Sequence, residues 1–202
     1  MNVFKDDAEI RQWLEKNFPA NNLDLNEEEV KKQFIANFGK EKYDEFSFTT
    51  ELDKAVYKVA KFLDIPFIPF FFDDIKEDGR YYPDWDCFII NKKFLFNWIE
   101  CLKCLIHELK HSHQRYCVEH KEDKNLKFAP KDLISIWEKE LSQDERLIPA
   151  NELMNRWVEI DAFAFTKFAL KKLFGETWIH FDPFTDEVFN LYIKKYFNSE
   201  LD

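Results

Sequence analysis

The sequence predicts an α+β protein that is mainly helical, with a small sheet placed before a long central helix. Apolar residues recur at intervals of three or four over several long segments, which is typical of amphipathic helices. Only 3 of the 202 residues are glycine and 7 are proline, which argues against a turn-rich all-β protein. Two short apolar runs bounded by turn residues lie just before the central helix and are expected to form strands.

An acidic helical extension is expected at the N-terminus, over residues 1–48. Its first helix runs to about Asn17. Asn26 caps the second, since carboxylates in the next three positions favour the positive end of the helix dipole, and Gly39 ends it. The rest of the chain, residues 49–202, is expected to form the main domain.

A third helix and two strands open the main domain. Thr49 or Thr50 is expected to cap the helix. The first strand covers residues 66–72, where two prolines favour an edge position. After a turn at Asp78 and Gly79, the second strand covers residues 85–91. The apolar face of the third helix consists of Leu52, Val56, Val59 and Leu63.

Four further helices are expected after the strands. The central one covers residues about 94–119, with a core stripe of four apolar residues. The next covers residues 130–141, a long one runs from Pro149 to about residue 174, and the last covers residues 182–197. The core stripe of the central helix is Leu102, Leu105, Ile106 and Leu109, and the apolar face of the next helix is Leu133, Ile136 and Trp137.

Composition and charge argue against several classes of protein. The net charge of −10 disfavours binding to a nucleic-acid backbone. No apolar run approaches the roughly 20 residues that a membrane helix needs. The first residues lack the basic start and apolar centre of a signal peptide. We therefore expect a cytoplasmic protein, in which the four cysteines are reduced thiols.

The central helix contains the one sharp motif, His-Glu-x-x-His, at residues 107–111. Two histidines four residues apart lie on one face of a helix, about one turn apart. Both His107 and His111 can therefore place a ring nitrogen on one Zn²⁺ ion. Glu108 is next to the first ligand, where its carboxylate can take a proton from a water molecule.

A catalytic zinc site also needs a third protein ligand. The best candidate is Glu159 on the long helix, 48 residues past His111, because Ala162 on its face allows a close approach of the two helices. Asp161 projects about 200° away from Glu159 and is not expected to share the metal. Glu119 and Glu152 remain alternatives.

Together these residues resemble the minigluzincin group of zinc metallopeptidases, which includes the ImmA/IrrE-type peptidases. The resemblance covers about residues 50–175. It rests on the His-Glu-x-x-His motif and on the later run Glu159-x-Asp161-Ala162-x-Ala164-Phe165, which resembles the "glutamate helix" of that group. The chain departs from the ImmA/IrrE pattern at Lys110, where glycine is usual, and at Phe163, where Asn or Asp is usual.

The resemblance implies a zincin-like fold with His107, His111 and Glu159 as zinc ligands and Glu108 as general base and acid. The implied activity is hydrolysis of peptide bonds in a peptide or protein substrate, through a zinc-activated water. Substrates of such folds often pair with a sheet edge, for which residues 86–91 are our candidate. The oxyanion-stabilising donor is left open among Tyr81, Tyr82, Tyr116 and His180.

Three other features have structural interpretations. His113 is expected to be a satisfied core or helix-end histidine. Gln114 lies on the metal face, either in solvent or in contact with the substrate or with groups behind the ligands. The pair Cys101 and Cys104 is expected to be buried rather than to bind metal. The alternative to an enzyme is a metal-binding regulatory or interaction protein, a pseudo-peptidase that acts on a single partner. The sequence leaves the oligomeric state open.

Overall fold

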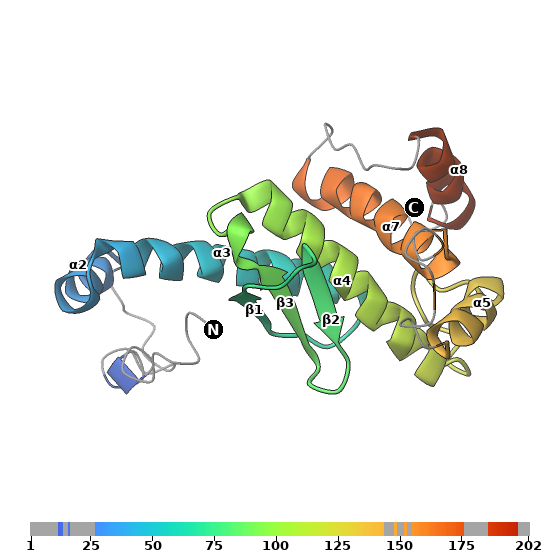
Figure 1. Ribbon diagram of the computed structural model, residues 1–202, viewed down its shortest axis with the longest axis horizontal. Helices are drawn as coiled ribbons and strands as arrows, with labels where there is room; N and C mark the ends of the chain where they lie inside the picture. The colour runs from blue at the N-terminus through green and yellow to red at the C-terminus, as the bar shows by residue number, and fades with distance from the viewer. Residues whose placement is uncertain are drawn as a thin grey trace.

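The computed structural model describes residues 27–143, 155–175 and 186–197, together with positions 12, 13, 16, 148 and 152. Within this part of the chain, six α-helices and a short 3-10 helix accompany one three-stranded sheet (Figure 1). The predicted fold class, mainly helical α+β with a small sheet before the central helix, is confirmed.

The elements follow one another in this order. Helices α2 (Glu27–Phe38) and α3 (Lys40–Leu63) come first. Strands β1 (Phe70–Asp73), β2 (Gly79–Tyr82) and β3 (Cys87–Asn91) follow, and then the 3-10 helix η1 (Lys92–Phe94). Helices α4 (Trp98–Glu119), α5 (Lys131–Leu141), α7 (Trp157–Phe174) and α8 (Asp186–Tyr196) complete the described chain.

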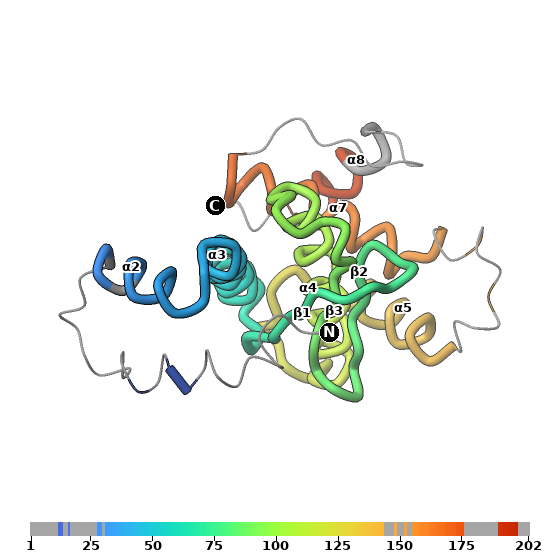
Figure 2. Tube along the Cα trace, turned by 60° about the vertical axis from the view of Figure 1, so that its left-hand side comes forward, coloured from blue at the N-terminus to red at the C-terminus, as the bar shows by residue number. Residues whose placement is uncertain are grey.

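Helix α4 is the centre of the fold. It contacts the sheet, α3, α5 and α7, and the two views show these elements surrounding it (Figures 1 and 2). Its predicted core stripe is confirmed, because all four residues of that stripe are fully buried. The buried residues of α4 also include polar ones, among them Lys110, His113 and Gln114, whose side chains must find partners inside the molecule.

The N-terminal part of the described chain differs in one respect from the prediction. Gly39, with φ of 89°, ends α2 as expected, but α3 starts at Lys40 and continues unbroken past residue 48. The predicted cap at Thr49 or Thr50 is therefore wrong. Both threonine hydroxyls donate to carbonyls of the preceding turn, which is an alternative to capping that helices tolerate. The predicted division at residue 48 stays a prediction.

The sheet has the order β1-β3-β2, with β1 parallel and β2 antiparallel to β3. The predicted edge position of β1 and the predicted strand at β3 are confirmed. The prediction missed β2, because its four residues follow directly on the turn at Asp78. As a result β3 is the central strand, and β2 is the edge strand that lies against α4.

The C-terminal helices differ from the prediction mainly at their starts. Helix α7 begins at Trp157 instead of near Pro149, because Arg156 has an extended backbone. The start predicted for the last helix, at residue 182, and the first predicted helix up to Asn17 lie outside the described residues, apart from isolated positions in the latter. None of the described helices has the length and apolar character of a membrane span.

The four cysteines form no disulfide with one another. Cys101 is fully buried, and its Sγ lies 3.1 Å from the Phe94 carbonyl oxygen. Burial raises the pKa of Cys101 to about 12 and that of Cys117 to about 12. Burial likewise raises the pKa of Cys104. Since the thiolate is the reactive form, these thiols are protected chemically as well as sterically.

We expect the native protein at pH 8 to react slowly with a thiol reagent such as DTNB. A thiol with a pKa of about 12 is ionised in only about one molecule in ten thousand at that pH. Absorbance at 412 nm, followed with and without guanidinium chloride, should show four reactive thiols only in the denatured protein. Rapid reaction of Cys101 or Cys117 in the native state would contradict this packing.

Candidate metal centre

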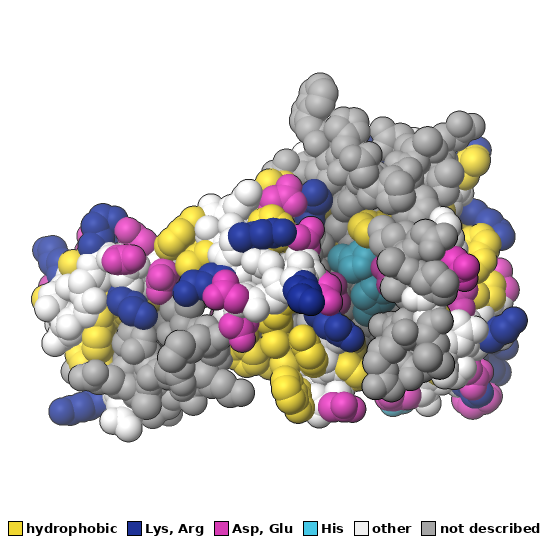
Figure 3. Space-filling view, in the orientation of Figure 1, with side chains coloured by type: hydrophobic (Ala, Val, Ile, Leu, Met, Phe, Trp, Pro, Cys, Tyr) yellow, Lys and Arg dark blue, Asp and Glu magenta, His cyan; other side chains and the backbone are white. Residues whose placement is uncertain are grey.

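Helix α4 presents His107 and His111 on the face that turns toward α7. The two positions are separated by one helical turn, and the opposite face is held in the core by Leu102, Leu105 and Ile106. The side chains of both histidines remain 15% exposed. Histidine side chains are visible at the surface in the space-filling view (Figure 3).

Glu159 comes from the first turn of α7, and the preceding helix fixes where that turn begins. The Glu140 carboxylate of α5 accepts hydrogen bonds from the backbone N–H groups of Trp157 (3.2 Å) and Val158 (3.0 Å). It thereby serves as a cap supplied from another helix. Ala162, one turn further on, is fully buried and lets α7 lie close to α4, as the sequence predicted.

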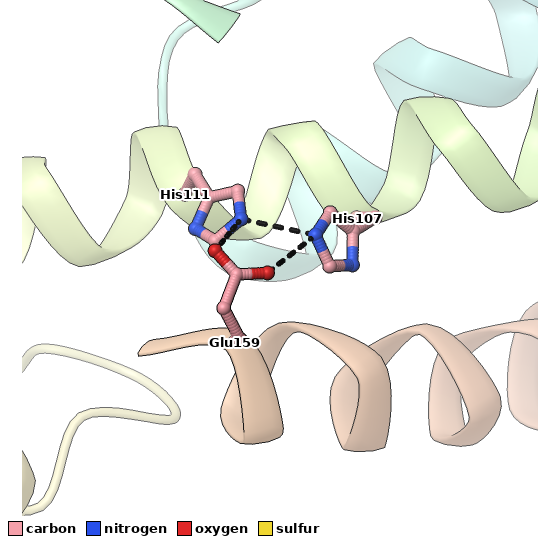
Figure 4. A group of neighbouring side chains, drawn as sticks. All are labelled: His107, His111 and Glu159. Carbon is pink, nitrogen blue, oxygen red and sulfur yellow. Dashed lines mark hydrogen bonds and ion pairs between the residues drawn. The ribbon is translucent and has the colours of Figure 1, made fainter. Parts of the chain in front are cut away.

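The three predicted ligand side chains converge on one point (Figure 4). The two Nε2 atoms of His107 and His111 lie 3.0 Å apart. Glu159 Oε2 is 3.2 Å from His107 Nε2, and Glu159 Oε1 is 3.4 Å from His111 Nε2. Among the described residues, these three are the group of His, Cys, Asp or Glu that could hold a metal ion.

The donor set and its spacing fit a zinc ion. Ligand atoms placed tetrahedrally at about 2.0–2.1 Å from zinc are about 3.3 Å from one another. The separations between the Nε2 atoms and the Glu159 oxygens are close to that value. Two imidazoles and one carboxylate leave a fourth position open, which is the pattern of catalytic rather than structural zinc sites.

Charge at this point favours a cation. Burial alone would lower the pKa of His111, but the charge and hydrogen bond of Glu159, together with Glu108 and Gln114, outweigh burial and raise it to about 9. Burial would raise the pKa of Glu159, and the two imidazoles outweigh that effect and hold it well below its usual range. The same position therefore attracts either a proton or a metal ion, and the two compete.

Glu108 lies outside the group of three converging side chains and contacts the sheet. It is 8% exposed, and its Oε2 accepts a hydrogen bond of 2.6 Å from the backbone N–H of Tyr81 on β2. The strand can come this close because Gly79 has no side chain. A Cβ there would lie 3.3 Å from Cys104 Cβ and 3.5 Å from Glu108 Cγ. Glu108 is thus held beside the site by an edge strand that the sequence analysis missed.

The predicted substrate-binding edge is wrong. Residues 86–91 were expected to form it, but β3 is hydrogen-bonded on both sides, to β1 and to β2. A strand with neighbours on both sides has no free backbone groups to offer a peptide. The sheet edge beside the candidate metal centre is β2.

Behind the three converging side chains lies a buried polar network that sequence analysis did not predict. Lys110 and Asp161 are both fully buried, and Lys110 Nζ lies 3.3 Å from Asp161 Oδ2. The ammonium group also lies over the rings of Trp137, at 4.9 Å, and Phe165, at 5.2 Å. The one feature of the sequence that could have indicated this network is Lys110, which stands inside the motif where glycine is usual. As predicted, Asp161 is not part of the metal group.

The other candidates lie elsewhere. His113 is buried and pairs with the Lys127 carbonyl through Nε2, at 2.8 Å, as expected for a core histidine. Glu119 and Glu152 are exposed and lie outside the metal group. Cys101, which is fully buried, and Cys104 also lie outside it. The Tyr81 phenol donates to Asp86. The rings of Tyr82 and Tyr116 stack on Trp85 and His120. His180 lies outside the described residues, so the oxyanion donor stays unassigned.

Comparison of the chain with protein-family models, with curated proteins and with solved structures gives no significant match. The observations that bear on function are therefore the geometry of this site and the resemblance of its motif.

The buried ion pair predicts a large effect of Lys110→Met. This change leaves Asp161 as a buried carboxylate without its cation, so the free energy of unfolding should fall by about 3–5 kcal/mol. Urea denaturation followed by circular dichroism measures it. Lys121→Met is the matched control, because Lys121 forms an exposed pair with Glu138 and should change stability by less than about 1 kcal/mol. Equal effects of the two changes would contradict the structural role of Lys110.

Proposed function

We propose that this chain is a zinc-dependent metallopeptidase of the gluzincin type. The observation that carries the proposal is the convergence of His107, His111 and Glu159 from two helices, with an additional carboxylate, Glu108, held beside them but outside the ligand group. The resemblance of the motif and of the later glutamate helix to minigluzincins supports the same function.

The residues divide the chemistry between them. A zinc ion held by the three ligands would polarise the scissile carbonyl and lower the pKa of a water molecule toward 7. Glu108 takes a proton from the attacking water and passes it to the leaving amine nitrogen. Because Oε2 of Glu108 is engaged by the Tyr81 N–H, we assign the proton transfer to Oε1.

The substrate in this proposal is an extended peptide that pairs with the edge strand β2. Backbone hydrogen bonds along a sheet edge align a peptide whatever its sequence. Tyr81, whose N–H binds Glu108, lies on this strand, so a peptide paired with β2 would run past the general base. This edge replaces the one at residues 86–91 that the sequence suggested.

The purified protein is expected to contain about one zinc ion per chain. His111→Ala and Glu159→Ala should each lose most of it, because each removes one of three ligands. Mass spectrometry of the metal content measures this. Glu152→Ala is the control. Glu152 is exposed and precedes α7, so the variant protein should keep its zinc. A wild-type protein that does not bind added zinc would contradict the proposal.

Glu108→Gln should keep its zinc and lose hydrolysis of a peptide library by roughly 10²–10⁴-fold, because the amide cannot accept the proton. Glu119→Gln, an exposed change on the same helix, should cleave like the wild type. Mass spectrometry of the cleaved peptides measures both. If the wild type binds zinc but cleaves no peptide, the regulatory alternative, a metal-binding protein with a single partner, replaces the peptidase.

A further inference from the structure

Gln114 connects the candidate ligand His111 to helix α7. It lies three residues after His111 on α4 and is fully buried. Its Oε1 is 3.0 Å from His111 Nδ1. Its Nε2 donates to the Val158 carbonyl, at 2.8 Å, and to Asp161 Oδ2, at 2.7 Å. An amide side chain has two N–H donors and two acceptor lone pairs. Three of these four are used here, and one lone pair of Oε1 is left over.

These contacts determine which way the Gln114 amide points. The Val158 carbonyl can only accept hydrogen bonds, so the NH₂ group of Gln114 must face it. The amide oxygen then faces His111, and it can only accept. When the ring of His111 carries a single proton, that proton must therefore be on Nδ1. Its Nε2 is left with a lone pair, and this is the atom that lies near His107 and Glu159.

The network continues to the C-terminal helix. Asp161 Oδ1 accepts a hydrogen bond of 3.1 Å from the hydroxyl of Tyr192 on α8. Its Oδ2 is shared by Gln114 and Lys110. Tyr192 is only 6% exposed, so solvent does not compete strongly for these contacts. A continuous chain of buried hydrogen bonds thus runs from α8 through α7 to the imidazole of His111.

The other imidazole has no such support. His107 Nδ1 is buried and has no hydrogen-bond partner among the described residues, and its ring packs on Phe163 with centroids 4.4 Å apart. Packing restricts the plane of a ring but does not select which nitrogen holds the proton. His111 is therefore the candidate ligand whose orientation and protonation are set by polar contacts.

We propose that Gln114 is a positioning residue for the metal, and that Asp161 and Tyr192 hold it in place, so that helix α8 forms part of the metal-binding apparatus. Partners of this kind fix the tautomer of a ligating histidine, and their loss typically weakens metal binding by about 10–100-fold. The inference rests on the metal site of the proposed function and does not depend on peptide hydrolysis.

The test compares three variants by competition with a chromogenic zinc chelator. Gln114→Met keeps the length of the side chain without its polar groups, and zinc affinity should fall by about 10–100-fold. Tyr192→Phe removes one remote hydroxyl, and zinc affinity should fall by up to about tenfold. Tyr196→Phe on the same helix is the control, because its hydroxyl contacts Asp132 and Lys195 outside the network, and affinity should stay unchanged.

A second measurement separates positioning from a general loss of stability. At saturating Co²⁺, the visible absorption spectrum reports the geometry around the metal. Gln114→Met should alter this spectrum, whereas a variant that is only less stable should fill with cobalt and show the wild-type spectrum. Circular dichroism checks that each variant is folded, and if Gln114→Met is not, Tyr192→Phe carries the test alone.

The outcomes distinguish this inference from the proposed function. Wild-type zinc affinity and an unchanged cobalt spectrum in folded Gln114→Met, or in Tyr192→Phe if only that variant folds, would overturn the positioning role while the metal site stands. Failure of the wild-type protein to bind zinc would overturn both proposals. Zinc binding without peptide cleavage would overturn the proposed peptidase activity. The predicted losses of zinc affinity would then still test the role of Gln114.

Discussion

The ion pair between Lys110 and Asp161 is the constraint on which the rest of the site depends. It joins the central helix to α7 where neither side chain is exposed to solvent, so a misplaced partner would leave a buried charge unpaired. Lys110 is adjacent to His111, and Asp161 is two residues past Glu159. One register of the two helices therefore satisfies the ion pair and brings the candidate ligands together. We interpret this ion pair as a contact that selects the register of the two helices. Apolar packing alone would restrict that register less strictly.

The local parts of this arrangement were predictable from sequence, and the reason is helical periodicity. Residues four apart share a helix face, which gives His107 and His111 without knowledge of the fold. The same periodicity identified the buried faces of α3 and α4. The third candidate ligand, Glu159, required an expectation about a second helix, which the small residue at Ala162 and the resemblance of the motif supplied.

The parts that sequence did not predict are those in which a polar residue is satisfied at a distance. Lysine is a residue usually found at the surface, and only the fold places Asp161, Trp137 and Phe165 around Lys110. Strand β2 was missed because its four residues follow directly on the turn at Asp78, and the error in the substrate-binding edge followed from that. The helix start expected at Thr49 failed for a related reason, since a threonine side chain can bond either forward as a cap or back to the previous turn.

The separation of the two carboxylates is what gives the site its chemical character. Glu108 and Glu159 both lie near the imidazoles, so either could in principle be drawn to a bound cation. The two imidazoles contact Glu159 at 3.2 Å and 3.4 Å, whereas the backbone N–H of Tyr81 holds Glu108 on the strand. A carboxylate that became a fourth ligand would close the position that water and substrate need. The hydrogen bond from β2 holds the Glu108 carboxylate at the strand, as the proposed proton transfer requires, and this is the strand with which we propose that a peptide pairs.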